Sequence, residues 1–390
     1  MPPDLRTLRV DQVGGLAAPK AYWHAFTRFR DGTIDGAAWA TLQDEAVREA
    51  LRAQEGIGFP VLSDGELRRT NFQESFANAV SGFDVPDGAQ YNYQRSAHAG
   101  LGNVRAEQDF SAPGPAIFTR RAVKARLRLV RNVPLEEYRF AAANAATPVK
   151  VTLLGPDRIA QRFDWEASRA VYRDIDAFLD DVVAIERAMI AELVAAGCRY
   201  IQIDAPGYTA YVDPLSRERM KARGEDPDAN LARSIAADNA VIGGFDDVVF
   251  GLHVCRGNPR TVDRATGKIV GQWHREGHYD AIAEQLFAGL DHHRLLLEYD
   301  TERAGDFSPL RFVPKGKIAV LGLVTTKDAA TESKDVLKRR IDEAARHLPL
   351  DQLALSPQCG FGGLSPNVID TKDQWQKLAR ILETAAEVWR

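Results

Sequence analysis

The chain is poor in cysteine, has no long apolar run and carries no excess of basic charge. Its three cysteines, Cys198, Cys255 and Cys359, are too few and too widely spaced for a disulfide framework, and they suit a reducing compartment. No run approaches the roughly 18 apolar residues that cross a bilayer, and the N-terminus lacks the apolar core of a secretion signal. The net charge of -4 gives no field that would attract nucleic acid or lipid. We therefore expect a cytoplasmic protein with no nucleic acid and no membrane as partner.

What the sequence does contain is a β/α alternation over most of its 390 residues. Short runs rich in β-branched and apolar residues alternate with segments of helical periodicity, which is the pattern of βα units in a parallel sheet. Several runs are continuously apolar, as strands covered on both faces should be. The predicted strands are residues 8–13, 59–63, 149–154, 200–203, 248–254, 295–298, 318–324 and 353–355. Eight strands with intervening helices predict an α/β fold, a (β/α)8 TIM barrel, as one domain over residues 1–390.

Apolar residues at helical spacing predict the helices between these strands. They recur from Trp39 to Ala50 and again from Ile175 to Leu193. Gly197 stands where the C′ residue of the second helix is expected, directly before the fourth strand. Further helices are predicted over residues 229–242, 279–289, 334–347 and 372–389.

The stretch of about residues 83–134, between the second and third strands, interrupts the alternation. It is rich in Gly, Pro, Asn and aromatic residues, and it is too long for an ordinary βα loop. We expect it to form an insertion over the barrel mouth. Within it, the segment PAIFTRRAVKARLRL is a candidate hairpin.

The motif HVCRGN places His253 and Cys255 at the end of the fifth strand. Side chains two apart on a strand point to the same face, so the imidazole and the thiolate would converge. Glu298 in LLLEYD and Cys359 in LSPQCGFGG stand at the ends of later strands, and the carboxyl ends of barrel strands are where active sites assemble. Because nitrogen and sulfur ligands suit tetrahedral zinc, these four residues predict a catalytic Zn²⁺ site.

Simpler interpretations exist for the same residue types. An isolated HxC pair at a strand end is commonly part of the core, and it is the addition of Glu298 and Cys359 that favours a metal site. Cys198 follows a helix and faces no partner, so we expect it in the core. His292 and His293 are expected on the surface.

Several motifs, taken together and in order, resemble one enzyme family. They are IQIDAPGY, HVCRGN, LEYD followed by RAGDFSPL, LGLVTTK and LSPQCGFGG. Spread over almost the whole chain, they resemble the catalytic, C-terminal barrel of cobalamin-independent methionine synthase and its single-barrel relatives, which include epoxyalkane:coenzyme M transferase. The resemblance implies a zinc-dependent methyltransferase or alkyltransferase whose zinc ligands match His253, Cys255, Glu298 and Cys359.

The resemblance also implies substrate-binding residues. In the methionine synthases two carboxylates hold the amino group of homocysteine, and they match Glu66 in SDGELRRTNF and Asp204 in IQIDAP. A glycine-rich backbone that holds the substrate carboxylate is similar to VGG, which includes Gly14 and Gly15. From the residues alone, Glu66 and Asp204 end the second and fourth strands, where an ammonium group would meet both. A helix cap or a salt bridge in the barrel is the alternative for each.

Some positions depart from the methionine synthases. Gly15 stands in place of a serine, Ala205 in place of a carboxylate, and Lys327 in place of the histidine that the family is thought to use to protonate the departing folate. The segment after Gly155 and Pro156 lacks the tryptophan on which a pterin ring would stack. These departures argue against folate as the methyl donor.

Three functions remain compatible with the sequence. The first is methyl transfer to homocysteine or a similar small thiol through a zinc-bound thiolate. The second is addition of another thiol to an electrophile, as in epoxyalkane:coenzyme M transferase, for which Arg68 or Arg69 would bind the sulfonate. The third is a non-catalytic zinc-binding or thiol-binding accessory protein.

Lys327, near the end of the seventh strand, is the candidate catalytic residue, and it would assist the leaving group or bind an acidic part of the donor. A solvated surface lysine is the alternative. The expected partners are a small-molecule thiol and an alkyl donor, and the sequence leaves open a homo-oligomer or a donor protein.

Overall fold

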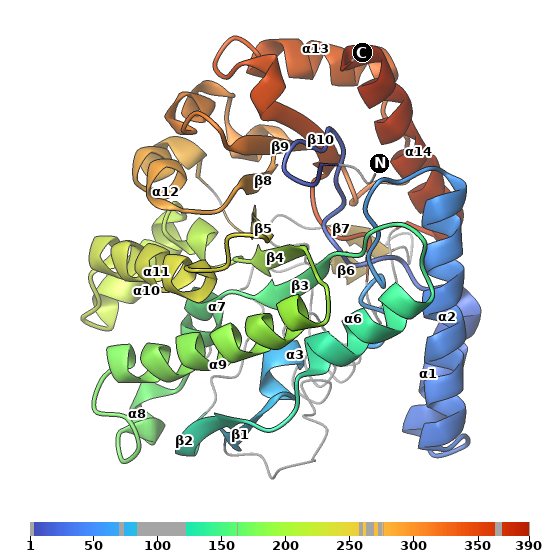
Figure 1. Ribbon diagram of the computed structural model, residues 1–390. Helices are drawn as coiled ribbons and strands as arrows, with labels where there is room; N and C mark the ends of the chain where they lie inside the picture. The colour runs from blue at the N-terminus through green and yellow to red at the C-terminus, as the bar shows by residue number, and fades with distance from the viewer. Residues whose placement is uncertain are drawn as a thin grey trace.

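The computed structural model describes residues 4–69, 74–83, 122–161, 163–256, 260–262, 269–271, 275, 277–362 and 369–389. Within them, the central element is a six-stranded parallel sheet with the strand order β10-β9-β8-β5-β4-β3 (Figure 1). All residues of these strands are buried, as expected of a parallel sheet that is covered on both faces. The last six predicted strands are thus confirmed. Their bounds are β3 Val151–Leu154, β4 Tyr200–Asp204, β5 Val249–Val254, β8 Arg294–Glu298, β9 Ile318–Val324 and β10 Leu353–Pro357.

The first two predicted strands, residues 8–13 and 59–63, are not strands in the structure. Each segment nevertheless lies beside one edge of the sheet, the first next to β10 and the second next to β3, and is joined to it by one parallel bridge. The bridges pair Val10 with Leu355 of β10, and Leu62 with Val149 just before β3. The prediction of extended strands was therefore wrong for these two segments, although their place beside the sheet was correct.

Side-chain hydrogen bonds explain why the second segment is not a strand. The Gln54 side chain accepts a hydrogen bond from Ser63 N (3.0 Å) and donates one to Ser63 O (2.9 Å). Since these backbone groups are already paired, they do not extend a strand ladder. Gln12 Nε2 donates to Val61 O (3.2 Å), which also brings the first segment beside the second.

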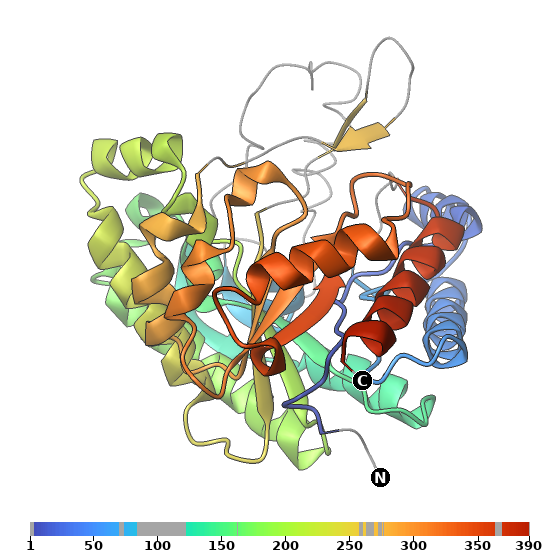
Figure 2. The same cartoon turned by 90° about the horizontal axis from the view of Figure 1, so that it is seen from above.

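Helices surround the sheet on its outer side (Figures 1 and 2). The periodic segments around Trp39 and Ile185 lie in α2 and α9, and Gly197 follows α9 with a φ of 101°, as a C′ glycine should. Residues 279–289 divide into a 3₁₀ turn, Tyr279–Ala281, and the short helix α12. The main helices are α1 Lys20–Arg30, α2 Gly36–Gly56, α6 Val133–Ala143, α7 Pro156–Gln161, α9 Ile175–Ala195, α10 Pro214–Ala222, α11 Pro227–Ile242, α12 Ala283–Gly289, α13 Lys334–Ala344 and α14 Thr371–Val388.

Local sequence signals fix the beginnings of several helices. An aspartate side chain accepts a hydrogen bond from the first turn of each of four helices, which satisfies a backbone N–H that has no partner inside the helix. The capping residues are Asp35 of α2, Asp174 of α9, Asp226 of α11 and Asp370 of α14. None of the helices in the described residues is long and apolar enough to cross a membrane.

The predicted insertion is described only at its two ends. Strand β1 (Val80–Phe83) pairs antiparallel with β2 (Val123–Leu129), and residues 84–121 lie outside the described residues. The expected hairpin therefore contributes its second part, β2, to a ribbon whose other strand is β1. Helix α6 begins at Val133, inside the range assigned to the insertion. A second two-stranded ribbon, β6 (Arg260–Val262) with β7 (Ile269–Gly271), was not predicted.

Candidate metal centre

The four predicted ligands come together at the carboxyl ends of three strands. His253 is the last residue but one of β5, and Cys255 directly follows this strand. Glu298 is the last residue of β8, and Cys359 lies just after β10. One donor atom from each residue can be chosen so that all lie within 4.8 Å of one another. His253, Cys255 and Glu298 are buried, and Cys359 is partly exposed. The parallel strands bring these ends to one edge of the sheet although the residues are up to 106 positions apart in sequence.

The spacing of the donor atoms suits a tetrahedral ion. The sulfurs of Cys255 and Cys359 are 3.7 Å apart, and two sulfurs bound to one zinc at about 2.3 Å would lie about 3.8 Å apart. Nε2 of His253 lies 3.9 Å from Oε1 of Glu298. One imidazole, two thiols and one carboxylate form a donor set that zinc accepts. The residues present therefore fit a zinc ion.

His253 is oriented by a carboxylate on the neighbouring strand. Its Nδ1 lies 3.2 Å from Oδ1 of Asp204, and its Nε2 lies 3.3 Å from the carbonyl oxygen of Gln358. Burial alone would lower the pKa of His253, but the hydrogen bond to Asp204 and the nearby Cys255 and Glu298 outweigh it and raise the pKa to about 9. A carboxylate on the second nitrogen of a histidine ligand is the usual support of a metal-binding imidazole.

The thiols of Cys255 and Cys359 lie within hydrogen-bonding distance of each other. The hydrogen bond to Cys359, together with burial, raises the pKa of Cys255 well above its usual value. A bound cation would reverse this effect, because it stabilises the thiolate form directly. A metal ion bound here would therefore stabilise the thiolate form that the protein alone disfavours at Cys255.

Glu298 is held by groups that the sequence alone did not assign. Its Oε1 accepts a hydrogen bond from the backbone N of Arg256 (2.8 Å), and its Oε2 accepts one from the buried Arg303 (3.0 Å). Lys327, the predicted catalytic residue, has its Nζ 4.0 Å from the same Oε2 and 3.0 Å from Oδ2 of Asp300. Lys327 thus lies beside the candidate centre and is paired with Asp300, rather than being a solvated surface lysine.

Glu66 lies in the loop after the second predicted segment, in an unusual backbone conformation. Its φ of 54° is rare for a residue with a side chain and costs on the order of 1 kcal/mol or more. Its Oε1 accepts a hydrogen bond from Thr152 Oγ1 (2.8 Å), which itself accepts one from Arg69 (2.9 Å). Burial raises the pKa of Glu66 to about 7, since Arg69 only partly offsets it and Asp204 adds to it. Glu66 is therefore a buried carboxyl whose one neighbouring cation in the described residues, Arg69 at 4.0 Å from Oε1, is bound more closely by Glu137.

The predicted substrate glycines lie against both Glu66 and the Cys359 loop. A Cβ on Gly14, whose φ is 136°, would come within 2.6 Å of Glu66 Oε1. A Cβ on Gly15 would come within 2.7 Å of the carbonyl oxygen of Gly362, and Gly15 O accepts a hydrogen bond from Phe361 N (2.8 Å). Glycine is thus required at both positions by the close approach of neighbouring groups.

Other predictions can be compared with the structure. Cys198 is fully buried and its Sγ donates to Tyr200 O, as expected of a core cysteine. His292 is also fully buried, so its prediction as a surface residue was wrong, and neither of its ring nitrogens has a hydrogen-bond partner among the described residues. His293 is partly buried and accepts a hydrogen bond from Phe250 N (3.0 Å), because both histidines immediately precede the buried strand β8.

The two arginines proposed for a sulfonate are engaged elsewhere. Arg69 is buried and donates to Glu137 (2.6 Å from Nη2 to Oε2) and to Thr152. Arg68 pairs with Asp44 at 2.5 Å and lies over the ring of Phe140. Neither guanidinium is available to an incoming anion without breaking an existing ion pair.

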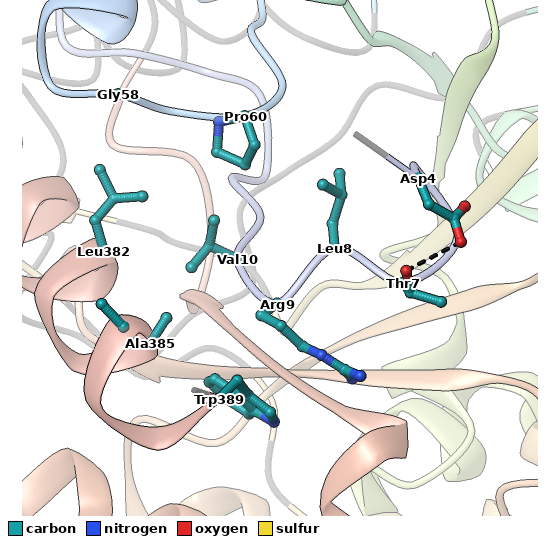
Figure 3. A pocket seen from close by; sticks show the side chains of 11 residues that line it. Asp4, Thr7, Leu8, Arg9, Val10, Gly58, Pro60, Leu382, Ala385 and Trp389 are labelled. Atoms are coloured by element: carbon teal, nitrogen blue, oxygen red, sulfur yellow. Dashed lines mark hydrogen bonds between the residues drawn. The ribbon is translucent and has the colours of Figure 1, made fainter. Parts of the chain in front are cut away.

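A surface groove of about 440 Å³ lies away from this centre (Figure 3). It is formed by the N-terminal segment, the turn at Gly58 and Pro60, and the end of α14 with Trp389. These residues flank the beginnings of the first two predicted strands, whereas the candidate ligands follow the ends of strands. The groove contains none of the predicted site residues.

Comparisons with known proteins give the same family from independent directions. Residues 12–262 match the model of the cobalamin-independent synthase catalytic domain. The chain is 32% identical to uncharacterized protein YxjH of Bacillus subtilis, over 98% of this chain and 95% of that protein. It is 25% identical to a protein of Pyrococcus abyssi named methionine synthase, over 87% and 81% of the two chains. A solved structure from Listeria monocytogenes, described as a candidate vitamin-B12 independent methionine synthase, has a TM-score of 0.73, 22% identity and 98% coverage of both chains, and it supports the fold.

Proposed function

This chain belongs to the cobalamin-independent synthase family, and we propose that it is a zinc-dependent methyltransferase that methylates homocysteine or a similar small thiol. The observation that carries the proposal is the convergence of His253, Cys255, Glu298 and Cys359, whose donor atoms can all lie within 4.8 Å. We further propose that the sheet closes as a (β/α)8 barrel. Residues 8–13 and 59–63 lie beside opposite edges of the sheet, and they contact each other because Gln12 donates a hydrogen bond to Val61 O. The candidate centre would then lie at the carboxyl end of that barrel.

The metal would supply the activation that a free thiol lacks. A thiol with a pKa near 8.5 is mostly protonated at neutral pH, and zinc bound at this centre would stabilise its thiolate form. The acceptor sulfur would then form a bond to the methyl carbon while the donor leaves with the electron pair of the broken bond. Lys327, beside Glu298 and Asp300, is the candidate group for protonating or binding the departing donor.

Two carboxyl groups favour an amino-acid thiol as the acceptor. Glu66 and Asp204 are both buried and close enough for the charge of Asp204 to raise the pKa of Glu66. An ammonium group placed between them would be a cation for both, and it would restore the charged form of Glu66. Arg68 and Arg69, the cations that the sequence offered for a sulfonate thiol, already hold other partners.

Zinc-edge X-ray absorption with different thiols tests this proposal. The full chain is loaded with zinc and measured alone, with homocysteine, with coenzyme M and with homoserine, which has a hydroxyl in place of the thiol. We expect two sulfur neighbours in the protein alone and three with homocysteine only. An unchanged sulfur count with homocysteine would contradict thiol activation, and a third sulfur with coenzyme M alone would support the sulfonate-thiol reaction instead.

Product analysis completes the test. The zinc-loaded chain is incubated with homocysteine and candidate methyl donors, and methionine is measured by mass spectrometry. We expect methionine to form with the true donor and to be absent with the zinc-free chain. Zinc binding without any thiol response would favour the accessory-protein function.

A further inference from the structure

A buried row of polar side chains runs through the sheet interior to the candidate centre. Lys150, just before β3, lies with its Nζ 2.8 Å from Asp11 Oδ1 and 2.7 Å from Gln202 Oε1. Gln202 Nε2 lies 2.8 Å from Asp204 Oδ1, and Asp204 in turn contacts His253. Strands β3, β4 and β5 are neighbours in the sheet (Figure 1), which is why Lys150 just before β3, Gln202 and Asp204 of β4 and His253 of β5 can form one row.

The chemistry of Lys150 fixes the direction of the Gln202 amide. An ammonium group can only donate hydrogen bonds, so the amide oxygen of Gln202 must face it. The amide nitrogen must then face the other way, where it donates to Asp204 Oδ1 and to Val13 O (2.6 Å). The orientation of this amide therefore follows from its partners and not from an arbitrary choice of oxygen and nitrogen.

The direction of the amide in turn constrains Asp204 and His253. Because Gln202 donates to it, Oδ1 of Asp204 acts as an acceptor, and the imidazole N–H of Nδ1 is the group that it accepts from His253. Nε2 of His253 then faces Oε1 of Glu298, at 3.9 Å, and the carbonyl oxygen of Gln358, at 3.3 Å. If a metal ion takes the place of a proton on Nε2, the proton on Nδ1 stays with Asp204 and the lone pair of Nε2 is free for the metal.

We infer that Gln202 is a positioning residue of the metal centre, which holds Asp204 as the acceptor that sets the tautomer of His253. The inference rests on the zinc centre of the proposed function. It adds a residue that touches neither the metal ligands nor the expected substrate, and that acts through Asp204. Since Gln202 also donates to Val13 O, directly before Gly14, it ties the glycine loop to the same row.

A buried amide elsewhere in the interior provides a matched control. Gln54 is as fully buried as Gln202, and it also makes several hydrogen bonds, with Gln12, Ala50 and Ser63. Within the described residues, its partners are not hydrogen-bonded to Asp204 or His253. Replacing either glutamine by leucine removes a buried amide of the same size, but only Gln202→Leu removes the donor to Asp204.

The first test measures zinc affinity of the full chain by competition with a chelator. We expect Gln202→Leu to weaken zinc binding by about 10- to 100-fold, the usual effect of removing an outer partner of a metal ligand. Gln54→Leu should lose comparable stability and keep zinc binding within about twofold of the wild type. Equal zinc affinities in the two variants would overturn the inference.

The second test uses the wild-type chain, so it does not depend on whether a variant folds. Long-range ¹H–¹⁵N correlation spectra of the zinc-loaded, ¹⁵N-histidine-labelled protein identify which nitrogen of each imidazole carries a proton. We expect His253 to be protonated at Nδ1, and a His253 that lacks this proton would overturn the inference.

The outcomes separate this inference from the proposed function. A wild type that binds zinc with the expected tautomer but never responds to a thiol would contradict methyl transfer and leave the role of Gln202 intact. A wild type without measurable zinc affinity would overturn both.

Discussion

Two buried carboxyl groups, Asp11 near the beginnings of the strands and Glu66 near their carboxyl ends, differ in the cations that surround them. Asp11 in the interior near the strand beginnings contacts Lys150 at 2.8 Å and Arg294 at 3.2 Å, and it accepts a hydrogen bond from Tyr200. Burial alone would raise the pKa of Asp11, but these two cations outweigh it and hold the pKa below its usual range. Glu66 near the strand ends has only Arg69, at 4.0 Å and shared with Glu137, and burial outweighs this cation and raises the pKa of Glu66 to about 7.

The difference separates a structural ion cluster from a binding site. Asp11 is neutralised by cations of the chain itself, so it needs no ligand. At the other end, burial outweighs the effect of Arg69 on Glu66, and two thiols of the candidate centre lie against each other. A metal ion and an ammonium group would add positive charge there, which is why we place binding at that end and stability around Asp11.

Loss of a thiol ligand should have the largest effect. Cys359→Ser removes one of two sulfur donors, and we expect zinc affinity to fall by more than the roughly 100-fold that loss of an outer partner can cost, with turnover lost together with the metal. Zinc content after dialysis and methionine formation measure both. Cys198→Ala is the control, because Cys198 is a core cysteine outside the centre. Retained turnover in a zinc-free Cys359→Ser protein would contradict the mechanism.

Breaking the ion cluster around Asp11 should affect stability instead. Asp11→Asn leaves Lys150 and Arg294 buried without their anion, and we expect the free energy of unfolding of the zinc-free chain to fall by about 3–5 kcal/mol. Urea unfolding measures the change. The folded fraction should still bind zinc. A loss of zinc affinity without a loss of stability would mean that Asp11 supports the metal centre and not the stability of the fold.

Neutralising Glu66 should weaken acceptor binding and leave the metal in place. Glu66→Gln removes a charged partner of the ammonium group, and we expect the dissociation constant for homocysteine to rise by roughly 10- to 100-fold. Calorimetry with the zinc-loaded protein measures the affinity. The exposed Glu136→Gln serves as a charge-matched control. Unchanged binding in Glu66→Gln would mean that the acceptor lies elsewhere.

The smallest expected effect is on the pH dependence of stability and comes from His292, which lies just before β8. Burial lowers the pKa of His292 to about 3 from an ordinary value of 6.5. The unfolded chain therefore binds the proton first, so this residue contributes stability that is present above pH 6.5 and is lost as the pH falls toward 3. We expect a loss of about 1 kcal/mol between pH 7 and pH 5.5.

The variant His292→Leu should remove this part of the pH dependence, because leucine has no proton to bind. Urea unfolding of the zinc-free wild type and variant at the two pH values measures it. An equal pH dependence in both proteins would show that His292 does not titrate as its burial requires.

Much of the fold follows from local sequence. The helices α2 and α9, the cap residues such as Asp174 and the last six strands were predictable, because helical spacing, capping and continuous apolar runs act over a few residues. Residues 8–13 and 59–63 have similar local patterns but are not strands. The Gln54 side chain takes up backbone groups of the second segment, and no local pattern indicates that contact.

Some residues of the candidate site could likewise be predicted from local sequence, and others could not. The spacing of His253 and Cys255 on one strand was sufficient to predict that they converge, and Gln202 stands two residues before Asp204 on the same face of β4, so alternation could have indicated it. Arg303 and Thr152 carry no such signal, since they meet Glu298 and Glu66 from other segments.

The sequence by itself determined which ligand types stand at the ends of strands, because strand ends are local features. Only the tertiary structure decided that Asp11 is held by Lys150 and Arg294 while Glu66 shares the more distant Arg69 with Glu137, and that His292 is buried. The physical reason is that charge balance and burial depend on side chains brought together from distant parts of the chain, and these contacts exist only after the sheet has formed.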